Sequence, residues 1–300
     1  MKLTTYYWGR TRRNKPAMAG LTFIIFLIIL AAAGPLFTVS PTHVNFDEKN
    51  MPLPGFTLKL SIYSAGSGGF VTTVQQGTWA HPLGTDGMGR DMLAMLISGA
   101  RVSLLVGLLA TGIAIMIGAL IGITSAYFGG AIDSILMRAT DIFMTFPFLL
   151  LLILIVYLFG GSLTLIILAI GLTGWTGTAR LVRSETLSLR TREFIMASTA
   201  LGASHLRIIF YHLLPNTLSS IIVIATLSIP GAILAEATLS FIGLGDPQVA
   251  SWGNILNAGQ GSLQTAWWVA VEPGLMLFFT VLAFNFLGEG LRAAFEPGGD

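Results

Sequence analysis

The chain has 300 residues, of which 54% are hydrophobic and 10% charged. Because a soluble globular chain carries about 25% charged residues, this composition predicts an integral membrane protein. A formal net charge of +2 gives no reason to expect a nucleic-acid partner, and the absence of cysteine excludes disulfides, thiolate metal sites and thiol nucleophiles.

Six apolar stretches, each bounded by charge or by Gly and Pro, predict six membrane-spanning helices. They run over 17–39, 102–127, 135–159, 163–179, 218–241 and 269–290. The first also has features of a signal peptide, namely a basic start and Ala31-Ala32-Ala33 near its end. It is longer than the apolar region of about 7–15 residues that signal peptides carry, so a retained helix is predicted. The third and fourth, joined by Gly160-Gly161-Ser162, are predicted to form an antiparallel hairpin, and Gly118-x3-Gly122 in the second has the spacing that lets helices approach closely.

Two connecting segments are long. Segment 40–100 mixes Pro, Gly and Ser with short apolar runs such as 56–63, which predicts a small ordered cap with a short strand. The glycines at 84, 87 and 89 predict a tight turn, with Asp91 near the start of the next helix.

Segment 180–214 is too charged to span a membrane and predicts two or three short helices. Its apolar residues recur at helical intervals: Phe194, Ala197, Leu201, Ile208 and Ile209. Gly202 lies between the two halves, where a sharp turn favours a residue without a Cβ atom.

Lys and Arg residues predict the orientation, because cytoplasmic loops carry an excess of them. With the N-terminus inside, twelve of the 16 lie inside and four outside. The four are Lys49, Lys59, Arg90 and Arg101. Both termini and segment 180–214 are therefore expected on the cytoplasmic side, with 40–100 and 242–268 outside.

Charged residues inside spans usually face the bundle interior, a partner or water. Asp141 is expected to pair with Arg138 three residues earlier, and Asp133 to be solvated. Glu236 has no basic residue within seven positions, in a span that Pro230 is expected to kink. Two readings stay open for it: with Thr226 and Ser228 it lines a translocation path or partner interface, or it is a buried structural carboxyl.

No catalytic, cofactor or metal site is expected on this chain. Its lysines all lie at or before position 59, so a phosphate-binding G-x4-G-K-[ST] loop is absent downstream, and ATP with its Mg would have to bind another chain. The four histidines show no metal-ligand spacing, although His205 and His212 can share a helix face.

Four motifs in order resemble the permease subunits of binding-protein-dependent peptide and nickel ABC importers. They are HPLGTDGMGRDMLAMLISGARVSL at 81–104, EFIMASTALGASHLRIIFYHLLPN at 193–216, AEATLSFIGLG at 235–245 with Ser251-Trp252-Gly253, and LAFNFLGEGLRAAFEP at 282–297. In the second, Met196, Ser198 and His212 depart from the family's Glu, Ala and Ile. The long outer segment and short tail resemble the second of the two permease subunits in such systems.

The resemblance implies an all-α protein with the six transmembrane helices of a type I ABC importer. It implies a tail, first helix and outer segment at 1–100, a permease domain at 101–291 with a coupling loop at 180–214, and a tail at 292–300. The partners implied are a homologous second permease, two ATP-binding subunits, an extracytoplasmic substrate-binding protein and membrane lipid, in a bacterial cytoplasmic membrane. The residues that the resemblance assigns to ATPase coupling are Glu193, Ala197, Ser198, Leu201, Gly202, Ala203, Ser204, Leu214 and Pro215.

Small peptides, from dipeptides to oligopeptides, are the predicted substrate. Nickel complexes or glutathione are alternatives within the same architecture. A secondary transporter would show intramembrane acid–base pairs or an inverted repeat, neither of which is clear. A scaffold or channel would not need the segment around Gly202 and Pro215.

Overall fold

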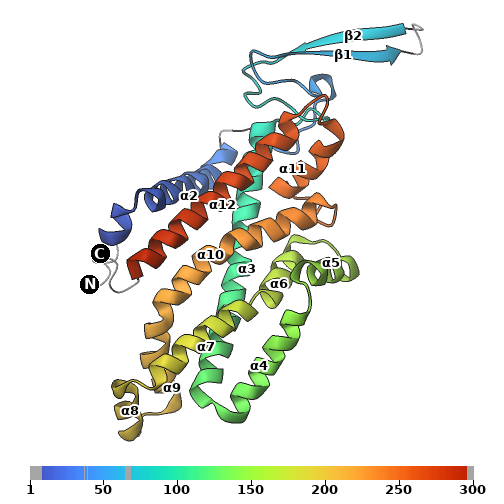
Figure 1. Ribbon diagram of the computed structural model, residues 1–300. Coiled ribbons are helices and arrows are strands. Elements are labelled where there is room, and N and C mark those ends of the chain that lie inside the picture. Colours follow the sequence, from blue (N-terminus) through green and yellow to red (C-terminus); the bar gives the residue numbers. More distant parts are fainter. Residues whose placement is uncertain (1–8, 37, 39, 65–68, 296–300) are drawn as a thin grey trace. The chain divides into compact units, whose positions relative to one another are not determined.

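The computed structural model describes residues 9–36, 38, 40–64 and 69–295, and most of them are helical (Figure 1). Lys2, the predicted end of the first span at 39 and most of the tail 292–300 lie outside these residues. Among the described residues, five helical segments are long and apolar enough to cross a membrane. Three are single helices: α2 (Lys15–Ala33), α3 (Met92–Phe128) and α12 (Trp268–Phe295). The fourth segment consists of α6 (Leu163–Thr173) and α7 (Thr176–Arg190). The fifth consists of α9 (His205–Arg207), a π-helical turn (Ile208–Leu213) and α10 (Leu214–Phe241). The chain is therefore a multi-pass membrane protein.

The third predicted span is divided into α4 (Gly130–Thr145) and α5 (Phe148–Phe159), which meet at 81°. Pro147 is the cause, because its ring excludes the helical conformation from the residue before it. Phe146 accordingly has extended backbone angles, φ −84° and ψ 129°. The prediction of an all-α protein with six spans is confirmed if the bent pair is taken as one span, but 135–159 is not one continuous helix.

The fourth predicted span is longer than expected. Helix α7 continues to Arg190, so the connecting segment begins near Thr191 instead of Arg180. Ala179, Val182, Thr186 and Leu189 form its buried face at intervals of three and four residues, while arginines occupy other faces. This amphipathic pattern explains why a charged stretch remains helical.

The chain divides into two compact units. The first comprises Met1–Phe23, Val106–Ala235 and Val281–Asp300, and the second Ile24–Leu105 and Glu236–Thr280. Within the first unit α4 contacts α7, and α5 contacts α6 across the tight Gly160 connection that was predicted. Helix α3 lies against α7: a Cβ atom on Gly122 would approach the Ala179 carbonyl oxygen to 2.6 Å, so the small-residue spacing does serve a close helix contact.

In the second unit, β1 (Thr57–Ser64) and β2 (Gly69–Gln76) form a two-stranded antiparallel ribbon (Figure 1). The strand over 56–63 was predicted, but its partner was not. Gly84 and Gly89 adopt positive φ, and Asp91 caps α3 by accepting from the Ala94 N–H at 2.8 Å, as the glycine pattern predicted. The indole of Trp252 in α11 (Trp252–Gly259) donates to the Leu96 carbonyl oxygen at 3.0 Å.

Candidate functional site

The connection between α7 and α10 contains α8 (Glu193–Ala200), which ends in a Schellman motif. The N–H of Ala203 donates to the Ser198 carbonyl at 3.1 Å, and that of Gly202 to the Thr199 carbonyl at 3.0 Å. Gly202 has φ +77°, the left-handed conformation that glycine adopts without steric cost. The predicted sharp turn is therefore confirmed, and it reverses the chain between α8 and α9.

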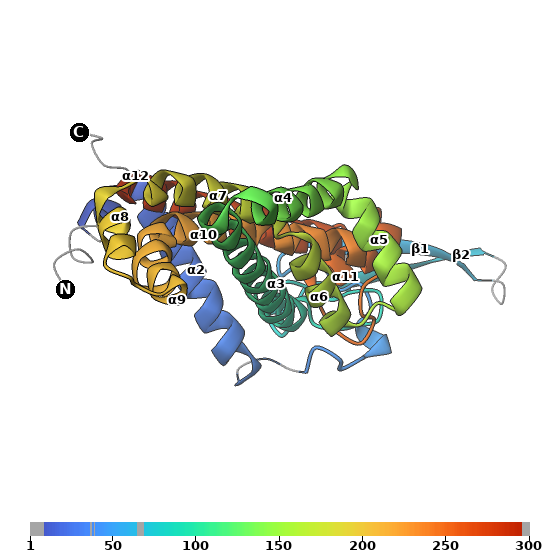
Figure 2. The ribbon, with the colours of Figure 1, turned by 90° about the horizontal axis from the view of Figure 1, so that it is seen from below.

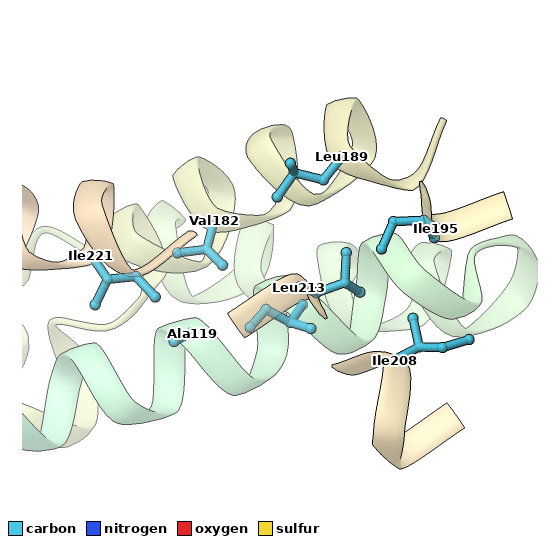
Figure 3. Close-up of a cluster of buried hydrophobic side chains, with 8 residues drawn as sticks. Ala119, Val182, Leu189, Ile195, Ile208, Leu213 and Ile221 are labelled. Carbon is cyan, nitrogen blue, oxygen red and sulfur yellow. The ribbon is translucent and has the colours of Figure 1, made fainter. Parts of the chain in front are cut away.

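Buried side chains hold this connection on the helices of the first unit (Figure 3). Ile195 from α8, with Ile208 and Leu213 from the π-helical turn, packs with residues of α3, α7 and α10. Ile208 and Leu213 are five residues apart, and the i→i+5 pattern of a π turn lets both face the core. Figure 2 shows α8 and α9 beside each other near the start of α10.

The outer face of the connection is apolar and exposed. Leu201 is 88% exposed and Leu206 68% exposed, on either side of the Gly202 turn. Met196 and Tyr211 are also exposed. The two or three short helices predicted here are present, and the apolar residues at helical intervals divide between the core and the surface: Ile208 is buried, whereas Leu201 is exposed because α8 ends at Ala200. This exposed surface, formed by Met196, Leu201, Leu206 and Tyr211, is named the α8–α9 face.

The remaining predicted coupling residues support this geometry. Glu193 is exposed in the first turn of α8, Ala197 is exposed and accepts from the Leu201 N–H, and the Ser198 hydroxyl donates to the Phe194 carbonyl oxygen at 2.8 Å. Ser204 caps α9, Ala203 and Leu214 pack against the buried cluster, and Pro215 lies in the first turn of α10. The structure thus places these residues along one connection, from α8 through the Gly202 turn to the start of α10.

The two histidines of this region have separate surroundings. The ring of His205 lies 2.8 Å from the Tyr127 hydroxyl, measured at Nδ1, which fastens α9 to the end of α3. His212 Nε2 lies 3.5 Å from the Ser198 hydroxyl, and its ring contacts Phe194. His205 thus ties the end of α3 to the α7–α10 connection, whereas His212 joins α8 to the π-helical turn within it.

Ion pairs connect α4 to α7. Arg183 donates from Nε and Nη2 to the two carboxylate oxygens of Asp133, each at 2.6 Å, and Ser125 donates to the same carboxylate. Asp133 is therefore not simply solvated, as was predicted. Asp141 accepts from Arg180 at 2.6 Å, so its predicted pairing with Arg138 was wrong. The physical reason is that α7 packs along α4 and presents a guanidinium opposite each carboxylate.

The three polar residues of α10 that were predicted to line a translocation path or partner interface, Thr226, Ser228 and Glu236, lie in different surroundings from one another. Thr226 donates to the Ile222 carbonyl oxygen at 2.9 Å, while Ser228 lines a cavity of about 670 Å³. Glu236, in the second unit, is 1% exposed and accepts from the Ser240 hydroxyl at 2.7 Å. Its second carboxylate oxygen has no hydrogen-bond partner among the described residues. Burial fits the reading of a structural carboxyl better than that of an open path.

Two protein-family models match the sequence. The model described as "Binding-protein-dependent transport system inner membrane component" matches residues 114–298. A second, "N-terminal TM domain of oligopeptide transport permease C", matches residues 3–52. The first includes the whole α7–α10 connection, and the second includes α2.

Curated proteins are similar over nearly the full length. A dipeptide transport system permease protein of Bacillus subtilis is 39% identical, covering 97% of this chain and 84% of its own length. An oligopeptide transport system permease protein of Haemophilus influenzae is 37% identical, covering 95% of this chain and 85% of its own length.

Solved structures share the fold. A chain of the inward-facing MetNI methionine ABC transporter aligns with a TM-score of 0.56 and 21% identity, over 68% of this chain and 98% of its own. A chain of an amino acid ABC transporter aligns with a TM-score of 0.50 and 18% identity, over 65% of this chain and 91% of its own. At this identity the likeness concerns the fold, which is that of type I ABC importer permeases.

Proposed function

The chain belongs to the family of binding-protein-dependent transport system inner membrane components, and from this premise we propose that it is a permease subunit of an ATP-driven importer of dipeptides and oligopeptides. A homologous permease supplies the other half of the translocation pathway. An extracytoplasmic binding protein delivers the peptide. Two partner ATPase subunits bind ATP and Mg, so this chain performs no catalysis itself.

The observation that carries the proposal is the α8–α9 face. Several large apolar side chains exposed close to one turn favour a protein interaction surface there. The turn is rigid because the Schellman motif fixes its backbone and Ile195 and Ile208 anchor it on both sides. A movement of an ATPase bound there is transmitted to α7 and α10.

The orientation follows from charge. The α7–α10 connection and both termini lie in the cytoplasm, where the ATPases are, because twelve of the 16 basic residues then lie inside. The ribbon β1–β2 and α11 face outward in this orientation, toward the binding protein.

Peptide is favoured over nickel or glutathione because relatives similar over nearly the full length of this chain are dipeptide and oligopeptide permeases. The test is uptake of labelled dipeptides to pentapeptides in cells lacking this subunit, with nickel uptake in the same strain. Peptide uptake should be lost, and restored by the gene, and depletion of ATP should stop it while collapse of the proton gradient should not. Loss of nickel uptake alone would contradict the substrate, and dependence on the proton gradient alone would contradict the mechanism.

A further inference from the structure

A cavity of about 420 Å³ lies within the second unit, between the end of α2 and the first turns of α3. Cavities of roughly 300–1,000 Å³ are the size of small-molecule binding sites. The chain that follows α2 packs directly against α3 here, because a Cβ atom on Gly34 would collide with the Ile97 side chain. The cavity is therefore a hollow between two helices that are in contact.

The lining of this cavity is amphipathic. Its apolar part is buried and consists of Ala31, Ala94 and Ile97. Its polar part consists of the Thr38, Ser40 and Ser98 hydroxyl groups and the Arg101 guanidinium group. Within the described part of the chain, the lining includes no Asp or Glu, so the cavity has one positive formal charge and favours an anion.

Arg101 lacks a counterion in the structure. It is exposed, and among the described residues its guanidinium group forms no hydrogen bond or ion pair. Arg90, the other arginine of the second unit, instead binds the Asp86 carboxylate, with 2.6 Å between Nη2 and Oδ2. Ser98 lies three residues before Arg101, on the same face of α3, and its hydroxyl group also has no hydrogen-bond partner among the residues that the structure describes. Both side chains therefore have free donors at the cavity.

Arg101 lies at the boundary of the membrane. No charged residue occurs between Arg101 and Asp133, so the apolar run that crosses the bilayer begins directly after Arg101. Long basic side chains at the ends of spans extend into the headgroup layer. Leu105, one turn further into the apolar run and on the same face, is 40% exposed. The cavity thus has a cation at headgroup level with an exposed apolar side chain beneath it.

Helix α2 contributes a second apolar surface beside the cavity. Ile25, Ile28 and Ile29 are 48%, 48% and 59% exposed, and they precede Ala31 in the lining by one or two turns. Exposed apolar side chains on a membrane-spanning helix are covered by acyl chains without cost. The surroundings of the cavity therefore suit a ligand with an anionic head and apolar tails.

A phospholipid has both parts. Its phosphodiester carries one negative charge, and a guanidinium group recognises phosphate through two parallel hydrogen bonds. The lining offers no carboxylate to the ammonium group of a zwitterionic lipid, so a lipid of net charge −1, such as phosphatidylglycerol, fits better. The glycerol hydroxyl groups of that headgroup can donate to the Thr38 and Ser40 oxygens.

We propose that this cavity binds the phosphate group of an anionic phospholipid, which Arg101 and Ser98 hold while the acyl chains lie along α2 and α3. The assignment to the outer leaflet rests on the orientation in the proposed function, whereas the chemistry of the cavity does not. The lipid is a bound ligand of this subunit and distinct from the lipid that surrounds any membrane protein.

The test uses the complete importer in phosphatidylcholine nanodiscs that contain a trace of labelled phosphatidylglycerol with a photoreactive acyl chain. After irradiation, the label attached to this subunit is measured. Unlabelled phosphatidylglycerol should remove part of the label, and phosphatidylethanolamine should require at least about fivefold more lipid for the same effect. Soluble glycerol 3-phosphate should remove none, because it has no acyl chains. The part that phosphatidylglycerol removes is termed the specific label.

Four variants locate the site. Arg101→Gln should lower the specific label about tenfold, as expected for the loss of hydrogen bonds to a charged group, and Arg101→Lys should lower it less because it keeps the charge. Ser98→Leu keeps Arg101 but fills the cavity, and it should also lower the specific label. Lys59→Gln removes a basic residue of β1 outside the cavity, so it is the matched control and should equal the wild type.

Three results would overturn the inference. Equal specific label in Arg101→Gln and Lys59→Gln, or equal competition by the two lipids, would show only the contact that surrounding lipid makes. Competition by glycerol 3-phosphate would show a site for a soluble phosphate ester. If Arg101→Gln does not assemble, an undiminished specific label in Ser98→Leu overturns the inference by itself. The assay requires no transport, so a failure of peptide uptake would contradict the proposed function alone.

Discussion

Arg183 in α7 binds both carboxylate oxygens of Asp133 in α4, with each nitrogen–oxygen distance 2.6 Å, although the two residues are fifty positions apart. The side chains are 32% and 21% exposed, so the pair is partly shielded from water. Arg180 and Asp141 join the same two helices, but their side chains are 50% and 60% exposed. The chain thus contains a shielded pair and an exposed pair in one interface.

We expect the shielded pair to contribute more stability than the exposed one. In a double-mutant cycle with Asp133→Asn and Arg183→Gln, the coupling free energy should be about 1.5–3 kcal/mol, as for hydrogen bonds to charged groups. The corresponding cycle with Asp141→Asn and Arg180→Gln is the control and should give about 0–1 kcal/mol. The measurement is the reversible unfolding of the purified protein in mixed micelles. Equal coupling in the two cycles would show that burial does not distinguish the pairs.

These pairs also show which ion pairs a sequence can predict. Arg138 and Asp141 have the spacing of neighbours on one helix, which made their pairing the natural prediction. The partner that the structure gives to Asp141 is Arg180, on a helix that the sequence interpretation ended at Ala179. Spacing identifies partners within a helix, whereas partners between helices depend on packing that a single sequence does not reveal.

Pro147 is plain in the sequence, but the apolar run 135–159 continues on both sides of it, so hydropathy alone predicts one span and not the break. The Gly202 turn was predictable for the opposite reason: a left-handed residue is a local requirement, and glycine reports it directly. The exposed position of Leu201 was not predictable, since apolar periodicity cannot distinguish a core face from an interface. Only the reversal of the chain at Gly202 places that side chain in solvent.

The effect of a substitution at Gly202 on transport should depend on the backbone conformation that the new residue tolerates more than on the size of its side chain. Because no atom lies within 4 Å of the position where a Cβ would be, a side chain there meets no neighbour. Asn tolerates the left-handed conformation, whereas a β-branched residue does not. Gly202→Asn should therefore keep most transport, and Gly202→Val should lose most of it while the protein remains inserted. The measurements are peptide uptake and substrate-stimulated ATPase activity. Equal activity of the two variants would refute a role for this turn in coupling.

The proposed orientation predicts labelling at introduced cysteines, which the chain allows because it has none of its own. Ser204 is exposed at the start of α9, and Trp79 is 84% exposed in the segment before α3. A membrane-impermeant thiol reagent should label Trp79→Cys in intact cells, but Ser204→Cys only in inside-out vesicles. Labelling of Ser204→Cys in intact cells would mean that the α7–α10 connection lies outside.

The last prediction concerns the α8–α9 face. Burial of a leucine side chain contributes about 1.5–3 kcal/mol, so replacing either exposed leucine by serine should weaken ATPase binding by roughly tenfold or more. Leu201→Ser and Leu206→Ser should change the folding stability of the subunit by no more than about 0.5 kcal/mol, because neither side chain is buried before the ATPase binds. Leu36→Ser is the matched control. Leu36 is 81% exposed, but it lies in the short 3-10 helix Gly34–Leu36 that follows α2 and not in the α7–α10 connection.

Co-purification of the ATPase with tagged permease, titrated with ATPase, measures the change. We expect a loss of affinity for both variants of the α8–α9 face, with the control equal to the wild type. Because Leu201 and Leu206 lie on opposite sides of the Gly202 turn, the double variant should lose the sum of the two binding free energies if both side chains enter one groove independently. If Leu201→Ser and Leu206→Ser bind the ATPase as tightly as the wild type, the apolar face serves another contact, and coupling must run through a different part of the connection.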